Sequence, residues 1–206
     1  MEPKWLEWAK ELQALSQDGL HYSENVFDIQ RYKRISDIAA EMMSANSDTD
    51  LKIIKDLFVM QEGHATPKVD VRGVVFMNDK ILLVKEKSDG NWTLPGGWAD
   101  PNETPSITVE REVFEESGFK VKASKVLAVL DRTKQGHVPP YPFHVYKIFF
   151  LCDLKGGSKK TSIETEDVNF FDEENIPKLS QARSTIKQIE RMFFMHKNPD
   201  LPADFD

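Results

Sequence analysis

The pattern of apolar residues changes at Gly63-His64-Ala65-Thr66-Pro67, and this change sets the organisation of the chain. Upstream, apolar residues recur at the spacing of amphipathic helices. Three such groups occur: Trp5, Trp8, Leu12 and Leu15; Ile35, Ile38, Ala39 and Met42; Leu51, Ile54, Leu57 and Phe58. From Val69 onward, short β-branched runs predict strands. We therefore expect a helical region over 1–63, a linker over 64–68 and a main domain over 69–206.

The main domain alternates expected strands with two expected helices. Strands are predicted over 69–77, 81–84, 119–130, 143–154 and 168–171, and helices over about 105–117 and 181–197. Ser180 is the expected N-cap of the second helix. This order predicts an α+β sandwich, in which helices cover both faces of a mixed sheet.

Composition narrows the possible partners. A formal net charge of -7 argues against broad binding to duplex DNA or to anionic membranes. No apolar run approaches the ~20 residues of a membrane span, and the N-terminus does not resemble a signal peptide, so we expect a cytoplasmic protein. The single cysteine, Cys152, lies in an apolar run and is expected in the core.

Three carboxylates gather at the end of the expected helix over 105–117. Thr104-Pro105 predicts its start and Gly118 its stop. Glu112, Glu115 and Glu116 then fall within an arc of about 100° in the last turns. Because a helix C-terminus favours cations, acids placed there oppose the helix dipole and one another. A bound Mg²⁺ or Mn²⁺ would remove this conflict; a solvated acidic face is the alternative.

The surrounding residues carry a family motif. The stretch reads G, five residues, E, seven residues, R-E, an aliphatic residue, any residue, E-E, any residue, G and an apolar residue. Those positions are Gly97, Glu103, Arg111, Glu112, Val113, Glu115, Glu116, Gly118 and Phe119. The stretch resembles the Nudix box, so the chain resembles the Nudix (MutT-like) hydrolases, and the resemblance implies their α/β/α sandwich.

The resemblance also implies residue roles. Glu112, Glu115 and Glu116, with the backbone carbonyl of Gly97, would bind Mg²⁺ or Mn²⁺. Glu103 and Arg111 would pair and orient the catalytic carboxylates. Family chemistry is attack of water on a phosphorus of a nucleoside diphosphate linked to another group X.

The general base is left open by the sequence. Glu116 is one candidate. The family often places a base or an extra metal ligand in the loop before the last strand, where Glu164, Glu166 and Asp167 are the acids. A solvated loop acid is the alternative for each of these three.

Candidate substrate contacts lie outside the box. Arg72, Lys85 and Lys147 sit on or near expected strands and could hold a diphosphate, whereas Trp92 could stack on a base or pack in the core. We expect the polar loop over 131–141, which includes Arg132, to bind and recognise group X.

The N-terminal helices extend the resemblance to a bacterial subgroup of hydrolases of X-linked nucleoside diphosphates that includes a CDP-choline pyrophosphatase of bacilli. The subgroup implies a small nucleotide substrate and a homodimer formed through the helices. Cleavage of CDP-choline to CMP and phosphocholine is the first expectation. ADP-ribose, a nucleotide sugar or nucleotide removal from RNA ends are alternatives. A non-catalytic nucleotide sensor is the alternative of another class.

Overall fold

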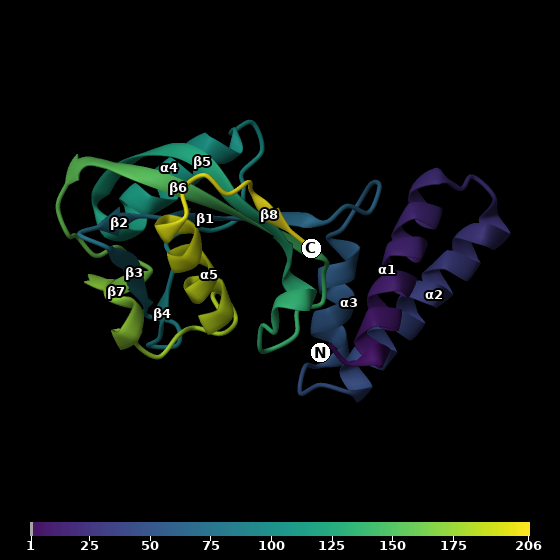
Figure 1. Cartoon of the computed structure of the whole chain (residues 1–206). Coiled ribbons are helices and arrows are strands. Elements are labelled where there is room, and N and C mark those ends of the chain that lie inside the picture. The colour runs from purple at the N-terminus through teal and green to yellow at the C-terminus, as the bar shows by residue number, and fades with distance from the viewer. Residues whose placement is uncertain (1) are drawn as a thin grey trace. The chain divides into compact units, whose positions relative to one another are not determined.

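The computed structural model describes residues 2–206, which fall into two compact units. One unit holds the residues to Pro67 together with Tyr141–His144, and the other holds Lys68–Pro140 and Val145–Asp206 (Figure 1). None of the helices in these residues has the length and apolar content that a bilayer span requires.

The helical unit contains α1 (Lys4–Tyr22), α2 (Val26–Ala45) and α3 (Leu51–Val59). Asn25 caps α2 and Asp50 caps α3, each through a side-chain oxygen that accepts backbone N–H groups. The small core of this unit includes Leu6, Ala39 and Phe58. Phe143 belongs to it, since its ring packs edge-on against Phe58 at 6.3 Å. The expected strand over 143–154 therefore begins late, at Val145.

The second unit is built on two four-stranded sheets. Its elements are β1 (Lys68–Val74), β2 (Phe76–Met77), β3 (Lys80–Glu86), β4 (Trp92–Thr93), α4 (Pro105–Ser117), β5 (Phe119–Asp131), η1 (Arg132–Gln135), β6 (Val145–Gly157), β7 (Thr165–Phe171), η2 (Glu173–Asn175), α5 (Ile186–Lys197) and β8 (Asp204–Phe205). One sheet has the order β1-β6-β5-β8, with β1 parallel to β6 and β5 antiparallel to it. The other has the order β2-β3-β4, and β7 also pairs with β3.

Each long helix of this unit packs on its own apolar core. Val109 and Val113 of α4 join one core with Val71 of β1, and Ile189 and Phe193 of α5 join the other. The predicted α+β class, with helices on both faces of a mixed arrangement of strands, is confirmed (Figure 1).

The predicted start of the last helix is wrong by several residues. Helix α5 begins at Ile186, because Thr185 and Gln188 form a capping box. Ser180, the expected N-cap, instead donates its hydroxyl hydrogen to Asp89 at 2.7 Å. Serine and threonine at 180, 184 and 185 are all competent caps, and only the structure shows which one is used.

Candidate active site

Helix α4 has strong signals at both ends. The Thr104 hydroxyl accepts the Ile107 N–H, and Pro105 occupies the first turn. Gly118 ends the helix at φ 78° in the left-handed region, which glycine adopts without steric cost. The three box carboxylates therefore lie in the last two turns. Glu116 is buried, Glu112 is half-buried and Glu115 is exposed.

Arg111 organises the acids around it. Its Nε donates to both carboxylate oxygens of Glu103 at 3.2 Å. Its Nη1 donates to Glu112 at 2.9 Å and to Glu115 at 3.0 Å, and its Nη2 donates to Asp100 at 2.9 Å. One guanidinium thus holds four carboxylates, and hydrogen bonding from Arg111 lowers the pKa of Glu103.

Glu116 is the most deeply placed of the three acids, at 5% exposure. Its Oε2 accepts the N–H of Gly96 at 2.9 Å. Burial raises its pKa to about 8, an effect that the positive charge of Arg72 offsets only in part. Gly96 has φ 138°, and a Cβ there would lie 2.1 Å from the Val71 carbonyl oxygen, so only glycine fits this position.

The donor set suits a hard divalent cation. A buried carboxylate with a raised pKa stands beside two further carboxylates on one helix end, and an added charge of +2 relieves their burial and repulsion. The backbone of Gly97 lies against Glu112: an added Cβ there would sit 3.2 Å from its Oε2. Among residues 2–206, no three Asp, Glu, His or Cys side chains are grouped closely enough to hold a metal ion. Arg111 donates hydrogen bonds to two of the box carboxylates, those of Glu112 and Glu115.

The acids before and in β7 divide into two kinds. Glu164 lines the same cavity as the three box glutamates. Glu166 pairs with Lys85 at 2.6 Å, and Asp167 pairs with Lys159 at 2.6 Å. The structure therefore brings Glu164 to the box carboxylates, whereas the other two acids are engaged by lysines.

Most of the predicted substrate contacts are engaged within the fold. Arg72 is 4% exposed and donates to both oxygens of Asp70 and to the Leu94 carbonyl. Lys147 is 2% exposed and lies opposite Asp70 in the β1–β6 register, with its Nζ 2.6 Å from the carboxylate. These two cations lower the pKa of Asp70 to about 2.

Of the other three predicted contacts, Lys85 is held by Glu166, and Trp92 and Arg132 are partly or fully covered. Trp92 is half-buried and packs edge-on against Phe171 at 4.7 Å. Arg132 is 8% exposed and donates to the carbonyls of Pro139 and Ala182. Arg132 therefore holds the polar loop in place from inside the unit.

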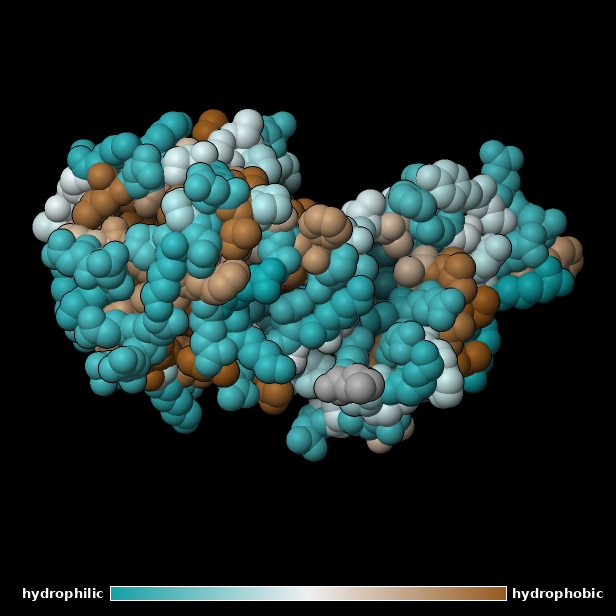
Figure 2. All heavy atoms as spheres, in the orientation of Figure 1, coloured by the Kyte–Doolittle hydropathy of each residue, from teal (hydrophilic) through white to brown (hydrophobic). Residues whose placement is uncertain are grey.

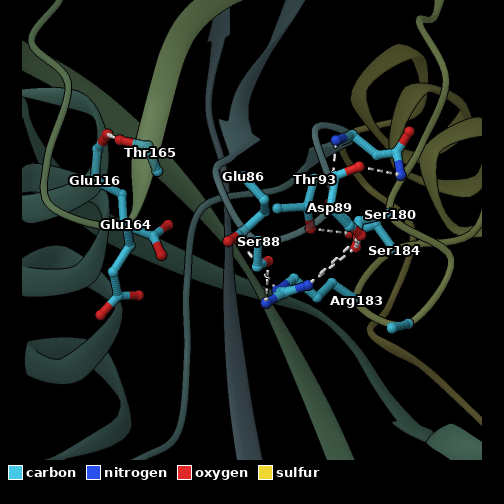
Figure 3. A network of polar contacts seen from close by, with 12 residues as sticks. Glu86, Ser88, Asp89, Thr93, Glu116, Glu164, Thr165, Ser180, Arg183 and Ser184 are labelled. Carbon is cyan, nitrogen blue, oxygen red and sulfur yellow. Dashed lines mark hydrogen bonds and ion pairs between the residues drawn. The ribbon is translucent and has the colours of Figure 1, made fainter.

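A second polar network borders the box and carried no sequence signal. Buried Glu86 at the end of β3 pairs with Arg183 at 3.1 Å, and Arg183 also reaches Ser88 and Ser180 (Figure 3). Figure 3 shows Glu116, Glu164 and Thr165 gathered on the other side of Glu86. Burial raises the pKa of Glu86, and its charge adds to the raised pKa of Glu116. Glu86 follows Lys85 at the end of an apolar strand, and the sequence does not show whether a carboxylate there is buried or solvated.

A cavity of about 670 Å³ opens beside the box acids. Its walls are the last turns of α4 and the segment 157–164. This arrangement can hold a cation at the carboxylate end and leaves room next to it for part of a substrate.

Comparison with known proteins agrees with this geometry. Residues 67–192 match the NUDIX domain, and residues 3–58 match the UDP-X-like, N-terminal oligomerisation domain. The chain belongs to the Nudix family. It is therefore a Nudix hydrolase, an enzyme of the pyrophosphatase class, and this expectation is confirmed.

Similar proteins extend over the whole length of this Nudix hydrolase. It is 43% identical over 206 residues to a putative ADP-ribose pyrophosphatase, YjhB, of Bacillus subtilis, covering 100% of this chain and 99% of the relative. The crystal structure of an ADP-ribose pyrophosphatase from Streptococcus suis has a TM-score of 0.63 and 38% identity, covering 68% of this chain and 100% of that one. A UDP-X diphosphatase structure has a TM-score of 0.64 and 28% identity, covering 98% of both chains.

Proposed function

We propose that this Nudix hydrolase cleaves the diphosphate of a nucleoside diphosphate sugar such as ADP-ribose. The observation that carries the proposal is the group of three carboxylates at the end of α4. Glu116 is buried, and Glu112 and Glu115 beside it accept hydrogen bonds from Arg111. The name of the Bacillus subtilis relative, which this chain matches over its full length, supports ADP-ribose as the substrate. CDP-choline, the first expectation from the sequence, remains a candidate within the same class.

Glu112, Glu115 and Glu116, with the backbone carbonyl of Gly97, would hold Mg²⁺ or Mn²⁺. The bound cation would polarise phosphoryl oxygens and offset the charge of the transition state. Arg111, fixed by Glu103, keeps Glu112 and Glu115 at the helix end. Burial raises the pKa of Glu116, and the charge of Arg72 and the Gly96 N–H lower it in part.

Glu164 is the general base that the geometry favours. It lines the cavity of the box acids, and none of its side-chain oxygens is engaged within residues 2–206. It would take a proton from the attacking water, whose oxygen bonds to one phosphorus. The bond from that phosphorus to the bridging oxygen breaks, and this oxygen leaves on the second monophosphate. Glu164 then releases its proton to solvent as the two monophosphates leave.

The helical unit is proposed to form a homodimer. Large apolar side chains are exposed on it, including Trp8 at 51%, Phe27 at 64% and Val59 at 77%. Figure 2 shows apolar side chains grouped on the visible face of this unit. Such groups of exposed apolar residues mark interaction surfaces, and the matched oligomerisation domain covers the same residues.

A substrate panel tests this proposal. ADP-ribose, UDP-glucose, CDP-choline, a dinucleoside polyphosphate and 5′-triphosphate RNA are incubated with Mg²⁺ or Mn²⁺, and the products are identified. We expect ADP-ribose to give AMP and ribose 5-phosphate, with activity lost in EDTA and restored by Mg²⁺. Binding without turnover of any substrate would favour the nucleotide sensor.

A further inference from the structure

The segment 157–164 forms a wall of the cavity, and its backbone is firmly anchored. The Lys160 N–H donates to the Ser117 carbonyl at 2.9 Å. The Lys87 ammonium donates to the carbonyls of Ser162 and Ile163, and the Lys87 N–H donates to the Glu164 carbonyl. The segment is therefore held to the end of α4 on one side and to β3 on the other.

Two glycines bring the backbones together at this point. Gly118 has φ 78° and Gly157 has φ 86°. A Cβ on Gly157 would lie 2.3 Å from the Gly118 carbonyl oxygen, and a Cβ on Gly118 would lie 2.4 Å from the Ser158 carbonyl oxygen. Neither position tolerates a side chain without movement. The wall thus stands at a fixed distance from the box acids.

Three side chains of this anchored segment have no partner in the part of the chain that the structure describes, whereas Lys159 pairs with Asp167 and the Ser162 hydroxyl bonds Thr165. Within residues 2–206, the side chains of Ser158, Lys160 and Thr161 form no hydrogen bond or ion pair, although all three line the cavity. A fixed backbone that presents free donors and acceptors is preorganised, since a ligand that binds them loses little further conformational entropy.

Apolar groups line the same cavity. Ile163 is 90% exposed, and Phe114, between the box acids on α4, is 48% exposed. Isolated exposed apolar residues are common on proteins. Here, however, Ile163 and the Phe114 ring line the same cavity of about 670 Å³ as the three polar side chains.

We propose that this cavity is the subsite for group X, that X is a hydroxylated sugar, and that Lys160, Thr161, Ile163 and Phe114 recognise it. The inference rests on the proposed function, because the carboxylate end must hold the diphosphate. The Thr161 hydroxyl and the Lys160 ammonium match the many hydroxyls of a sugar, and Phe114 and Ile163 match its C–H faces. A nucleobase would favour stacking between flat surfaces, and only one ring lines the cavity.

The test compares two substrates that share a nucleoside diphosphate and differ in X. ADP-ribose carries the sugar, and the β-methyl ester of ADP carries a methyl group in its place. Lys160→Ala and Ile163→Ser remove one polar and one apolar contact from side chains that are exposed, so folding is retained. Lys155→Ala is the control, because Lys155 pairs with Asp153 on β6 and does not line the cavity.

We expect each cavity variant to lower kcat/KM for ADP-ribose by about tenfold and that for the methyl ester by less than about twofold. The Lys155→Ala variant should match the wild type on both. Equal losses on both substrates, or no loss on either, would overturn the subsite. If wild-type protein hydrolysed neither compound with Mg²⁺, the proposed function itself would fail and the subsite with it.

Discussion

The hydroxyl group of Thr165 donates a hydrogen bond to the backbone carbonyl of Glu116 at 2.8 Å, and Thr165 is fully buried. The first residue of β7 is thereby tied to the last turn of α4. Thr165 of β7 is the register partner of Glu86 in β3. This hydrogen bond therefore links α4, β7 and β3 around the buried Glu116 carboxylate. The position of Glu116 thus depends on the sheet as well as on its own helix.

Thr165→Val should weaken this link while keeping the side-chain volume similar. We expect the free energy of unfolding to fall by about 1–3 kcal/mol, because a buried carbonyl loses its donor. Turnover should fall roughly tenfold or more, since the last turn of α4 is less well fixed. Urea unfolding and steady-state kinetics measure the two effects. Ser124→Ala on the exposed part of β5 serves as the control, and a Thr165→Val enzyme of wild-type kcat would show that the bond does not position the site.

Glu116 should make the metal-free protein less stable as the pH rises. Its pKa of about 8 exceeds the ordinary value of 4.5, so the native state holds this proton more tightly than the unfolded chain. Its contribution is therefore full below pH 4.5 and is lost as the pH rises to about 8. In EDTA, the wild type should lose stability relative to Glu116→Gln over this window, by up to roughly 5 kcal/mol. Parallel pH profiles for the two proteins would contradict the assignment.

If Glu116 is a ligand of the proposed cation site, magnesium should reverse this effect by binding the ionised carboxylate. Adding Mg²⁺ at pH 8 should raise the unfolding midpoint of the wild type and leave that of Glu116→Gln nearly unchanged. Thermal scans with EDTA and with excess Mg²⁺ measure the difference. An equal shift in both proteins would place the cation elsewhere.

His137 should add the opposite pH dependence to stability. Its Nδ1 lies 2.9 Å from the Gln181 carbonyl, and its Nε2 lies 3.1 Å from the Gln188 amide. Burial, together with the charge of Lys147, lowers its pKa to about 3 from 6.5. Below pH 6.5 the unfolded chain therefore binds a proton that the native state does not bind. The free energy of unfolding then falls by on the order of 1 kcal/mol per pH unit toward pH 3. His137→Asn should reduce this slope in urea titrations at pH 7, 6 and 5; an unchanged slope would exclude His137 as its source.

Glu164→Gln should distinguish the proposed general base from the other acids of its segment. We expect kcat to fall on the order of 10²-fold or more, because the attacking water loses its proton acceptor. Glu166→Gln is the matched control, because Glu166 pairs with Lys85 and lies outside the cavity lining. A larger loss in Glu166→Gln than in Glu164→Gln would reassign the base.

Local sequence signals made α4 predictable, whereas the partners of charged residues could not be predicted from the sequence. Thr104, Pro105 and Gly118 define the ends of α4 through their own backbone preferences, and the box spacing identified the carboxylates. The burial of Lys147 depends on the β1–β6 register that places it opposite Asp70, 77 residues away in sequence. Glu86 and Arg183 meet for the same kind of reason. A sequence pattern does not distinguish such residues from solvated charges on a strand.

The rate of ADP-ribose hydrolysis by Glu116→Gln, at saturating Mg²⁺ and substrate, tests the central claim most directly. Glutamine keeps the size of the side chain and an oxygen to accept the Gly96 N–H, so the fold should be retained and can be checked by circular dichroism. We expect kcat to fall on the order of 10³-fold relative to the wild type, because the deepest carboxylate of the proposed cation site is lost. A variant within tenfold of the wild type would show that the carboxylates at the end of α4 do not carry the reaction.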